Sequence, residues 1–66
     1  MQNNIGDNIK KRRLKLGLSQ EGFAQKSGVK YTTLTKIESG VIKTPSVLIA
    51  AKIAKGLAIS IEELIK

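Results

Sequence analysis

The side chains in this sequence that are best suited to binding a ligand stand together in residues 30–36. Each of them carries a positive charge or a hydroxyl group, so each can hydrogen-bond to a polar partner. Their spacing follows one side of a helix, and the apolar residues between them fall on the opposite side. They are Lys30, Tyr31, Thr32, Thr35 and Lys36. The chemistry that they support is recognition of a polar or anionic surface.

The remainder of the sequence contains little that would support catalysis. It has no histidine and no cysteine, so a zinc site is excluded, and no metal or other cofactor is expected. Five carboxylates are present, but their spacing does not bring any two of them together as a catalytic pair. They are Asp7, Glu21, Glu38, Glu62 and Glu63. An enzyme is therefore the class of protein that this sequence fits least.

Two short amphipathic helical patterns must position the residues of the first group. They lie within residues 18–40 and are joined by a Ser-Gly-Val turn, with Ser19 as the N-cap of the first and Gly40 closing the second. Gly28 stands in the turn, where two helices that meet at a steep angle need a residue tolerant of positive φ. The residues expected to be buried are Leu18, Phe23, Ala24, Val29, Leu34 and Ile37.

Three further helices are predicted outside this segment. The first covers residues 5–16. Another is expected to begin at Thr44 and Pro45, with the threonine as N-cap and the proline in the first turn. The last begins with a capping box formed by Ser60 and Glu63. The inner residues of these helices are expected to be Ile5, Ile9, Leu16, Val47, Ala50, Ile53, Ala54 and Leu57, with Ile61 or Leu64 and Ile65 at the end.

The charge of the chain favours a polyanionic partner. Its 66 residues carry a net charge of +7, and residues 1–56 alone hold eleven Lys and Arg against three acidic residues, a balance of +8. Basic charge distributed in this way favours phosphate contacts with release of counterions. The sequence has no apolar run near the roughly 20 residues of a membrane helix and no signal segment, so a cytoplasmic location is expected.

Six sequence elements occur in an order and at a spacing that define a resemblance. They are Ile5-Gly-Asp-Asn-Ile9, the basic run through Arg13, Leu16-Gly-Leu-Ser-Gln20, Thr44-Pro-Ser-Val47, Lys52-Ile-Ala-Lys55 and Ser60-Ile-Glu-Glu-Leu64. With them, nearly the whole chain resembles the lambda-repressor-like helix-turn-helix family, the Cro and Xre group of phage and bacterial transcriptional regulators. The resemblance implies an all-α, compact five-helix domain over residues 1–66, with a helix-turn-helix core at about residues 19–39.

The resemblance also implies a function and the residues that carry it. The chain is expected to bind double-stranded DNA sequence-specifically, most simply as a repressor that occupies operator half-sites through the major groove. The base-contacting residues implied are Lys30, Tyr31, Thr32 and Lys36. The phosphate-contacting residues implied are Gln20, Ser39, Lys43, Thr33 and Arg12. Arg13 and Glu38 are expected to form a structural ion pair that ties the first helix to the third.

The sequence departs from the family pattern at two helix ends. Lys30 replaces the Ser, Thr or Asp often found before the third helix, and a lysine has no acceptor with which to cap it. Gly56 falls slightly before the usual terminating glycine, at whose position this sequence has Ala58. The fourth helix is therefore expected to end in an irregular turn.

An apolar patch suggests a protein partner. Leu48 and Ile49, with Val41 and Ile42, stand outside the expected core and are candidates for a homodimer interface, at least on DNA. An alternative is a DNA-binding antitoxin, which would use the same patch to hold a toxin; a fused effector domain is a further possible partner. A cationic membrane-surface peptide is disfavoured because the apolar residues converge on one core.

Overall fold

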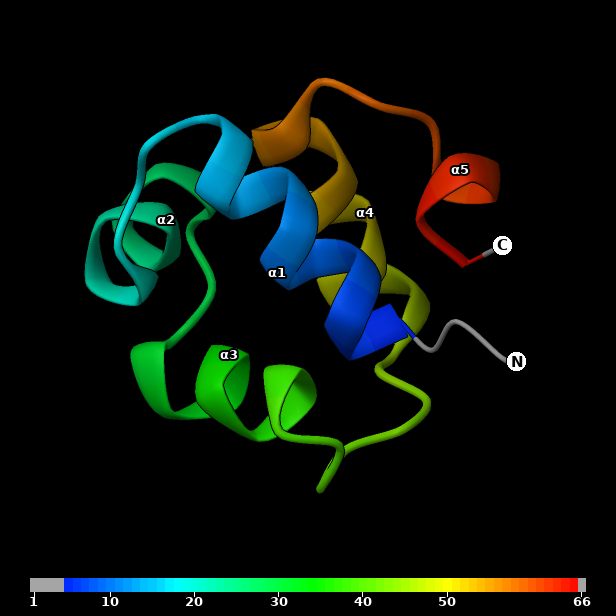
Figure 1. The fold of residues 1–66 in the computed structure, drawn as a ribbon. Coiled ribbons are helices and arrows are strands. Elements are labelled where there is room, and N and C mark those ends of the chain that lie inside the picture. Colours follow the sequence, from blue (N-terminus) through cyan, green and yellow to red (C-terminus); the bar gives the residue numbers. More distant parts are fainter. Residues whose placement is uncertain (1–4, 66) are drawn as a thin grey trace.

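Five helices follow one another along residues 5–65, the part of the chain that the computed structural model describes (Figure 1). They are α1 (Ile5–Lys15), α2 (Gln20–Ser27), α3 (Tyr31–Glu38), α4 (Val47–Leu57) and α5 (Ile61–Ile65). Residues 5–65 contain no strand, so the expected all-α class is confirmed. No helix in this part of the chain has the length and apolar character needed to cross a membrane.

The core is filled by side chains from all five helices; α1 and α4 contact each other, and α2 and α3 pack against each other. α1 packs against α3 and α5, and α4 packs against α2 and α5. Figure 1 shows α2 and α3 together on one side of α1 and α4, with α5 on the other. The side chains that fill the core are Ile9, Phe23, Ala24, Val29, Leu34, Ile37, Ala50, Ile53, Ala54, Leu57 and Leu64.

The turn between α2 and α3 has the geometry that the sequence predicts. Gly28 is left-handed, with φ 77° and ψ 16°, and its N–H donates to the carbonyl of Ala24. A residue with a Cβ is disfavoured in this conformation, which explains the glycine. At the other end of α2, the hydroxyl of Ser19 accepts a hydrogen bond from the N–H of Gly22 at 3.0 Å, as expected of an N-cap.

The predicted start of the fourth helix is wrong. The N-cap of α4 is Ser46, whose hydroxyl accepts from the N–H of Ile49 at 3.3 Å, and the helix begins at Val47. Thr44 and Pro45 therefore precede the helix. Both threonine and serine are good caps, and the sequence alone does not distinguish between two such residues placed two positions apart.

α4 does not end in the irregular turn that the sequence predicts, because it closes with a left-handed cap in which the N–H groups of Ala58 and Ile59 donate to the last carbonyls of the helix. Ala58 closes the helix in a left-handed conformation, with φ 59° and ψ 40°. Gly56 is inside the helix and buried, and a Cβ on it would lie 3.1 Å from both Phe23 Cε1 and Ser27 Cβ of α2. The glycine thus permits the close approach of α2 and α4, and an alanine is left to terminate the helix.

Three expected core residues are exposed, and of the alternatives Ile61 and Leu64 the structure buries Leu64. Val47 stands on the first turn of α4 and is 79% exposed, and Leu16 beyond α1 is 48% exposed. In α5 the buried residue is Leu64, whereas Ile61 and Ile65 face outward. Each of these side chains lies at or beyond a helix end or on a very short helix, where helical periodicity is a weak guide to burial.

Candidate nucleic-acid interface

α3 is held to the core on one side and is exposed on the other. Leu34 and Ile37 are fully buried and anchor the helix. Lys30 is the N-cap residue, and its side chain makes no capping hydrogen bond. All four side chains expected to contact bases lie at exposed positions: Lys30, Tyr31, Thr32 and Lys36. They therefore form the accessible surface of the helix that the sequence assigns to recognition.

Hydroxyl groups on the same helix are engaged with its own backbone. Thr35 Oγ1 donates to the carbonyl oxygen of Thr32 at 2.8 Å, and Ser39 Oγ donates to that of Lys36 at 3.2 Å. These oxygens retain lone pairs but need to rotate before they can donate to an anion. Thr33, expected at a phosphate, is partly buried at the side of the helix.

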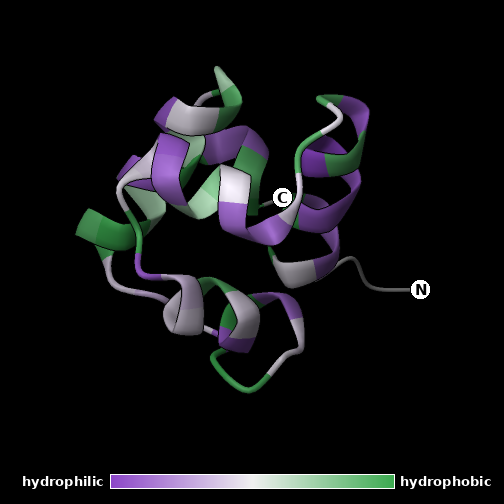
Figure 2. Cartoon of the chain, turned by 90° about the vertical axis from the view of Figure 1, so that its left-hand side faces the viewer, coloured by the Kyte–Doolittle hydropathy of each residue, from purple (hydrophilic) through white to green (hydrophobic). Residues whose placement is uncertain are grey.

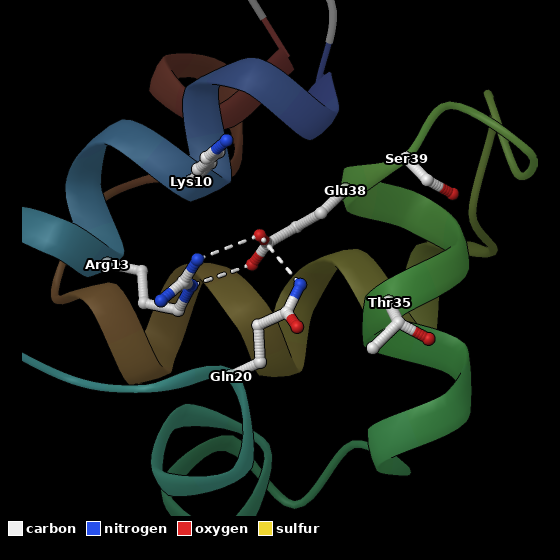
Figure 3. A pocket seen from close by; sticks show the side chains of 6 residues that line it. All are labelled: Lys10, Arg13, Gln20, Thr35, Glu38 and Ser39. Carbon is white, nitrogen blue, oxygen red and sulfur yellow. Dashed lines mark hydrogen bonds and ion pairs between the residues drawn. The ribbon is translucent and has the colours of Figure 1, made fainter.

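A network centred on the Glu38 carboxylate joins the first three helices. Arg13 Nε lies 2.9 Å from Glu38 Oε2, and Arg13 Nη2 lies 3.0 Å from Oε1. Gln20 Nε2, from the start of α2, donates to the same Oε1 at 3.2 Å. Figure 3 shows all three contacts converging on this carboxylate. We refer to Arg13, Gln20 and Glu38 as the Glu38 network.

The two charged side chains of this network are almost completely buried. The Arg13 side chain is 8% exposed and that of Glu38 is 4% exposed. Arg13 Nη1 also donates to the carbonyl of Leu18 at 2.8 Å, so the guanidinium contacts both α3 and the α1–α2 loop. The paired geometry and the additional donors compensate for the removal of both charges from water.

Gln20, expected to contact a phosphate, already donates one hydrogen bond within the protein. One hydrogen of its amide nitrogen is used by Glu38, which leaves the second available to an anion. The hydrogen bond to Glu38 was not predicted. Two polar residues eighteen positions apart on different helices give no sequence signal that they touch.

An open pocket of about 380 Å³ lies beside this network, between α1, α2 and α3. Its lining comes from all three helices and from the residue that caps α3, and Figure 3 shows how the side chains surround it. The lining residues are Lys10, Arg13, Gln20, Thr35, Glu38 and Ser39. The pocket thus borders the exposed face of α3.

Arg12 lies in different surroundings from the rest of the expected phosphate contacts. Its Nε donates to Asn8 Oδ1 at 2.9 Å, and Asn8 Nδ2 donates to the carbonyls of Glu63 and Leu64, both at 2.8 Å. Arg12 therefore belongs to the contact between α1 and α5. Lys43, in contrast, is exposed in the loop that follows α3.

Comparison with known proteins agrees with this architecture. Residues 9–64 match the model of the helix-turn-helix family. The chain belongs to this family, in its lambda-repressor-like, Xre-type branch, whose members are DNA-binding transcriptional regulators. A comparison with curated proteins gave no match.

Three solved structures resemble this one closely. The N-terminal DNA-binding domain of SinR from Bacillus subtilis is 33% identical with a TM-score of 0.87, and the alignment covers 91% of this chain and 87% of that one. The structure of SinR in complex with DNA, described as the master regulator for biofilm formation, is also 33% identical with a TM-score of 0.87. Its alignment covers 91% of this chain and 95% of that one. The restriction-modification controller protein C.AhdI from Aeromonas hydrophila is 32% identical, with a TM-score of 0.84 and coverage of 91% and 89%.

Proposed function

We propose that this protein binds double-stranded DNA sequence-specifically and represses transcription by occupying operator half-sites. The main support for this proposal is the exposure of α3: Leu34 and Ile37 anchor the helix in the core, and its polar, basic face lies at the surface. An α-helix fits the major groove of B-DNA, and base edges there are read by hydrogen-bonding side chains. SinR, which is similar over almost the whole chain, is described in complex with DNA, and this supports the same role here.

The roles of individual side chains follow from their chemistry. Lys30 and Lys36 are suited to guanine O6 and N7, Thr32 to a base edge or a thymine methyl group, and Tyr31 to either through its hydroxyl or ring. The contacts to backbone phosphates are assigned to Gln20, Ser39, Lys43 and Thr33. Arg12 is a weaker candidate because it contacts Asn8 on the side of α1 that faces α5.

The direct test is selection of bound sites from a pool of random duplex DNA, followed by titration at several salt concentrations. The expected result is a defined sequence motif and an affinity that falls by orders of magnitude between about 50 and 200 mM salt, if about six or more phosphates are contacted by a dimer. Absence of binding to any duplex at low salt would reject the proposal.

Substitution of two lysines distinguishes contacts with bases from contacts with the DNA backbone. Lys36→Ala removes an exposed side chain from α3, and we expect it to change the preferred base at a particular position of the selected site. Lys43→Ala removes the same charge from the following loop, and we expect it to weaken all duplexes equally. If Lys36→Ala also lowers the affinity for all duplexes equally, Lys36 does not contact a base.

We also propose that the protein associates with itself on DNA. Val41, in the loop after α3, and Val47 and Leu48, on the first turn of α4, are 72%, 79% and 66% exposed, and we refer to these three residues as the apolar edge. Figure 2 shows the hydrophobic colour of that loop at the bottom of the molecule. Ile42 and Ile49, which the sequence suggests for the same patch, pack against the core instead.

A second candidate function uses the same apolar edge. In a DNA-binding antitoxin, these side chains would hold a toxin in place of a second copy of the chain. If a toxin occupies the apolar edge, substitution of Val47 and Leu48 should leave binding to a two-site duplex unchanged. If a second copy occupies it, the same substitutions should remove the cooperativity, so the DNA-binding behaviour of that variant separates the two candidates.

A further inference from the structure

One cation on α1 differs from its neighbours in its surroundings. Lys10, Lys11 and Lys15 are all exposed, and by charge alone all three strengthen the field of the basic surface to a similar extent. Of the three, Lys10 lines the pocket between α1, α2 and α3. Arg13, one turn further along the helix, lines the same pocket, so the two residues share the face of α1 that is turned toward α3.

Lys10 is the one charged residue of the pocket lining that has no opposite charge as a partner in the described part of the chain. Glu38 is paired with Arg13, so these two lining residues contribute no net charge. Within residues 5–65, the Lys10 ammonium has no hydrogen bond or ion pair. The pocket therefore has a net charge of one positive, on a side chain that is free to meet an anion. Figure 3 shows Lys10 leaving α1 beside the Arg13–Glu38 pair.

The other donors of the pocket suit the same ligand. The amide of Gln20 keeps one hydrogen, and the hydroxyls of Thr35 and Ser39 become donors on rotation away from their own helix. A buried carboxylate would ordinarily repel an anion, but here both oxygens of Glu38 are covered by Arg13, and one also by Gln20. The groups are contributed by three helices, so an anion held here would fix α3 relative to α1.

We propose that Lys10 binds a backbone phosphate of DNA at the mouth of this pocket, as a contact from the first helix beside those of α2 and α3. The inference rests on the proposed function, because a duplex that fills the groove with α3 brings its backbone past the flanks of that helix. Phosphate contacts of this kind set the position of the protein on the duplex without reading its sequence.

The first test compares Lys10→Ala with Lys11→Ala in the 66-residue chain, on the selected duplex and on a mixed-sequence duplex. Both variants lose one exposed charge from the same helix, so they change the long-range field alike. We expect Lys10→Ala to weaken both duplexes by about three- to tenfold and to reduce the slope of log affinity against log salt by about 0.9. Lys11→Ala should change the slope by much less, and Lys10→Arg should restore most of the binding.

The second test locates the contact on the DNA. Duplexes in which single phosphates are replaced by neutral methylphosphonates identify the positions at which wild-type affinity depends on charge. We expect Lys10→Ala to become insensitive at one such position in each half-site, and Lys11→Ala to remain sensitive at all of them. Unchanged circular dichroism of both variants confirms that the fold is intact.

The outcomes distinguish this inference from the function on which it rests. If the wild-type chain binds no duplex at low salt, the proposed function fails and the inference with it. If the wild type binds but Lys10→Ala and Lys11→Ala lose equal affinity and equal slope, the function stands and Lys10 is not a phosphate contact. The same conclusion follows if Lys10→Ala keeps the wild-type response at every methylphosphonate position.

Discussion

Glu38 is the residue at which three helices meet. Its carboxylate accepts from Arg13 of α1 and from Gln20 of α2, while its own backbone forms the last turn of α3. A buried carboxylate without partners would destabilise the fold, but each oxygen here has at least one donor within 3.2 Å. The network therefore fixes the end of α3 that borders the pocket.

Removal of either charge from this network should destabilise the protein. Glu38→Ala and Arg13→Ala each leave the other charge buried and unpaired, and we expect each to lower the free energy of unfolding by about 3–5 kcal/mol. The double variant should lose less than the sum of the two. Urea denaturation of the four proteins measures the cycle, and strictly additive losses would mean that the pair contributes nothing as a pair.

Ala58, at the end of α4, is held in a left-handed conformation. Ala58 has φ 59°, where a Cβ costs about 1–2 kcal/mol, and glycine avoids this at the expense of a more flexible unfolded chain. We therefore expect Ala58→Gly to raise the free energy of unfolding by about 0.5–1 kcal/mol. Thermal unfolding followed by circular dichroism measures the change.

An alanine-to-glycine substitution inside α4 provides the control. Ala51 lies inside the helix, so Ala51→Gly should lower stability by about 0.5–1 kcal/mol. Opposite signs for the two variants are required. A loss of stability at Ala58 would show that the left-handed conformation is not maintained there in solution.

Both helices of the helix-turn-helix, α2 and α3, pack closely against a glycine of a neighbouring helix. A Cβ on Gly6 of α1 would lie 2.3 Å from the carbonyl oxygen of Ile37 in α3. The corresponding contact of α4 is at Gly56, against Phe23 of α2. Because the atom facing Gly6 belongs to the backbone, it cannot move without shifting α3 as a whole.

Gly6→Ala should displace α3, the helix that we propose enters the major groove. We expect a loss of about 1–3 kcal/mol in the free energy of unfolding, together with weaker DNA binding under conditions where the variant remains folded. Lys11→Ala, an exposed change on the same helix, should be within about 0.5 kcal/mol of wild type. Wild-type stability in Gly6→Ala would contradict the close packing of α1 on α3.

A domain of 66 residues offers few base contacts per copy. Two copies on a symmetric site double the contacts, and proximity on the DNA strengthens a weak interface between them. The apolar edge lies in the loop after α3 and at the start of α4. An interface there would set the distance between the α3 helices of the two copies.

The apolar edge is tested by Val47→Ser with Leu48→Glu. Both side chains are exposed, so the fold should be preserved while cooperative binding to a palindromic two-site duplex is lost. Gel-shift titration on full and half sites measures the cooperativity. Ile65→Glu, at the exposed end of α5, is the matched control and should remain cooperative. Loss of cooperativity in the control alone would move the interface to α5.

Features set by residues close together in the chain could be predicted from the sequence. The five helices, the Ser19 cap, the left-handed Gly28 and the capping box of Ser60 and Glu63 all depend on groups within one helical turn. The burial of Phe23, Leu34 and Ile37 follows in the same way from the period of the helix. The types and spacing of neighbouring residues are enough to predict these features.

The tertiary structure decided the contacts that join distant segments. Asn8 holds the end of α5 across 55 positions of the chain, Gly6 receives the backbone of α3, and Lys10 lines the pocket while Lys11 does not. Adjacent lysines on one helix look alike in a sequence. The donors beside Lys10 come from α2 and from the end of α3. Their positions relative to α1 are fixed only when the core is assembled, so the sequence does not show which lysine lies beside them.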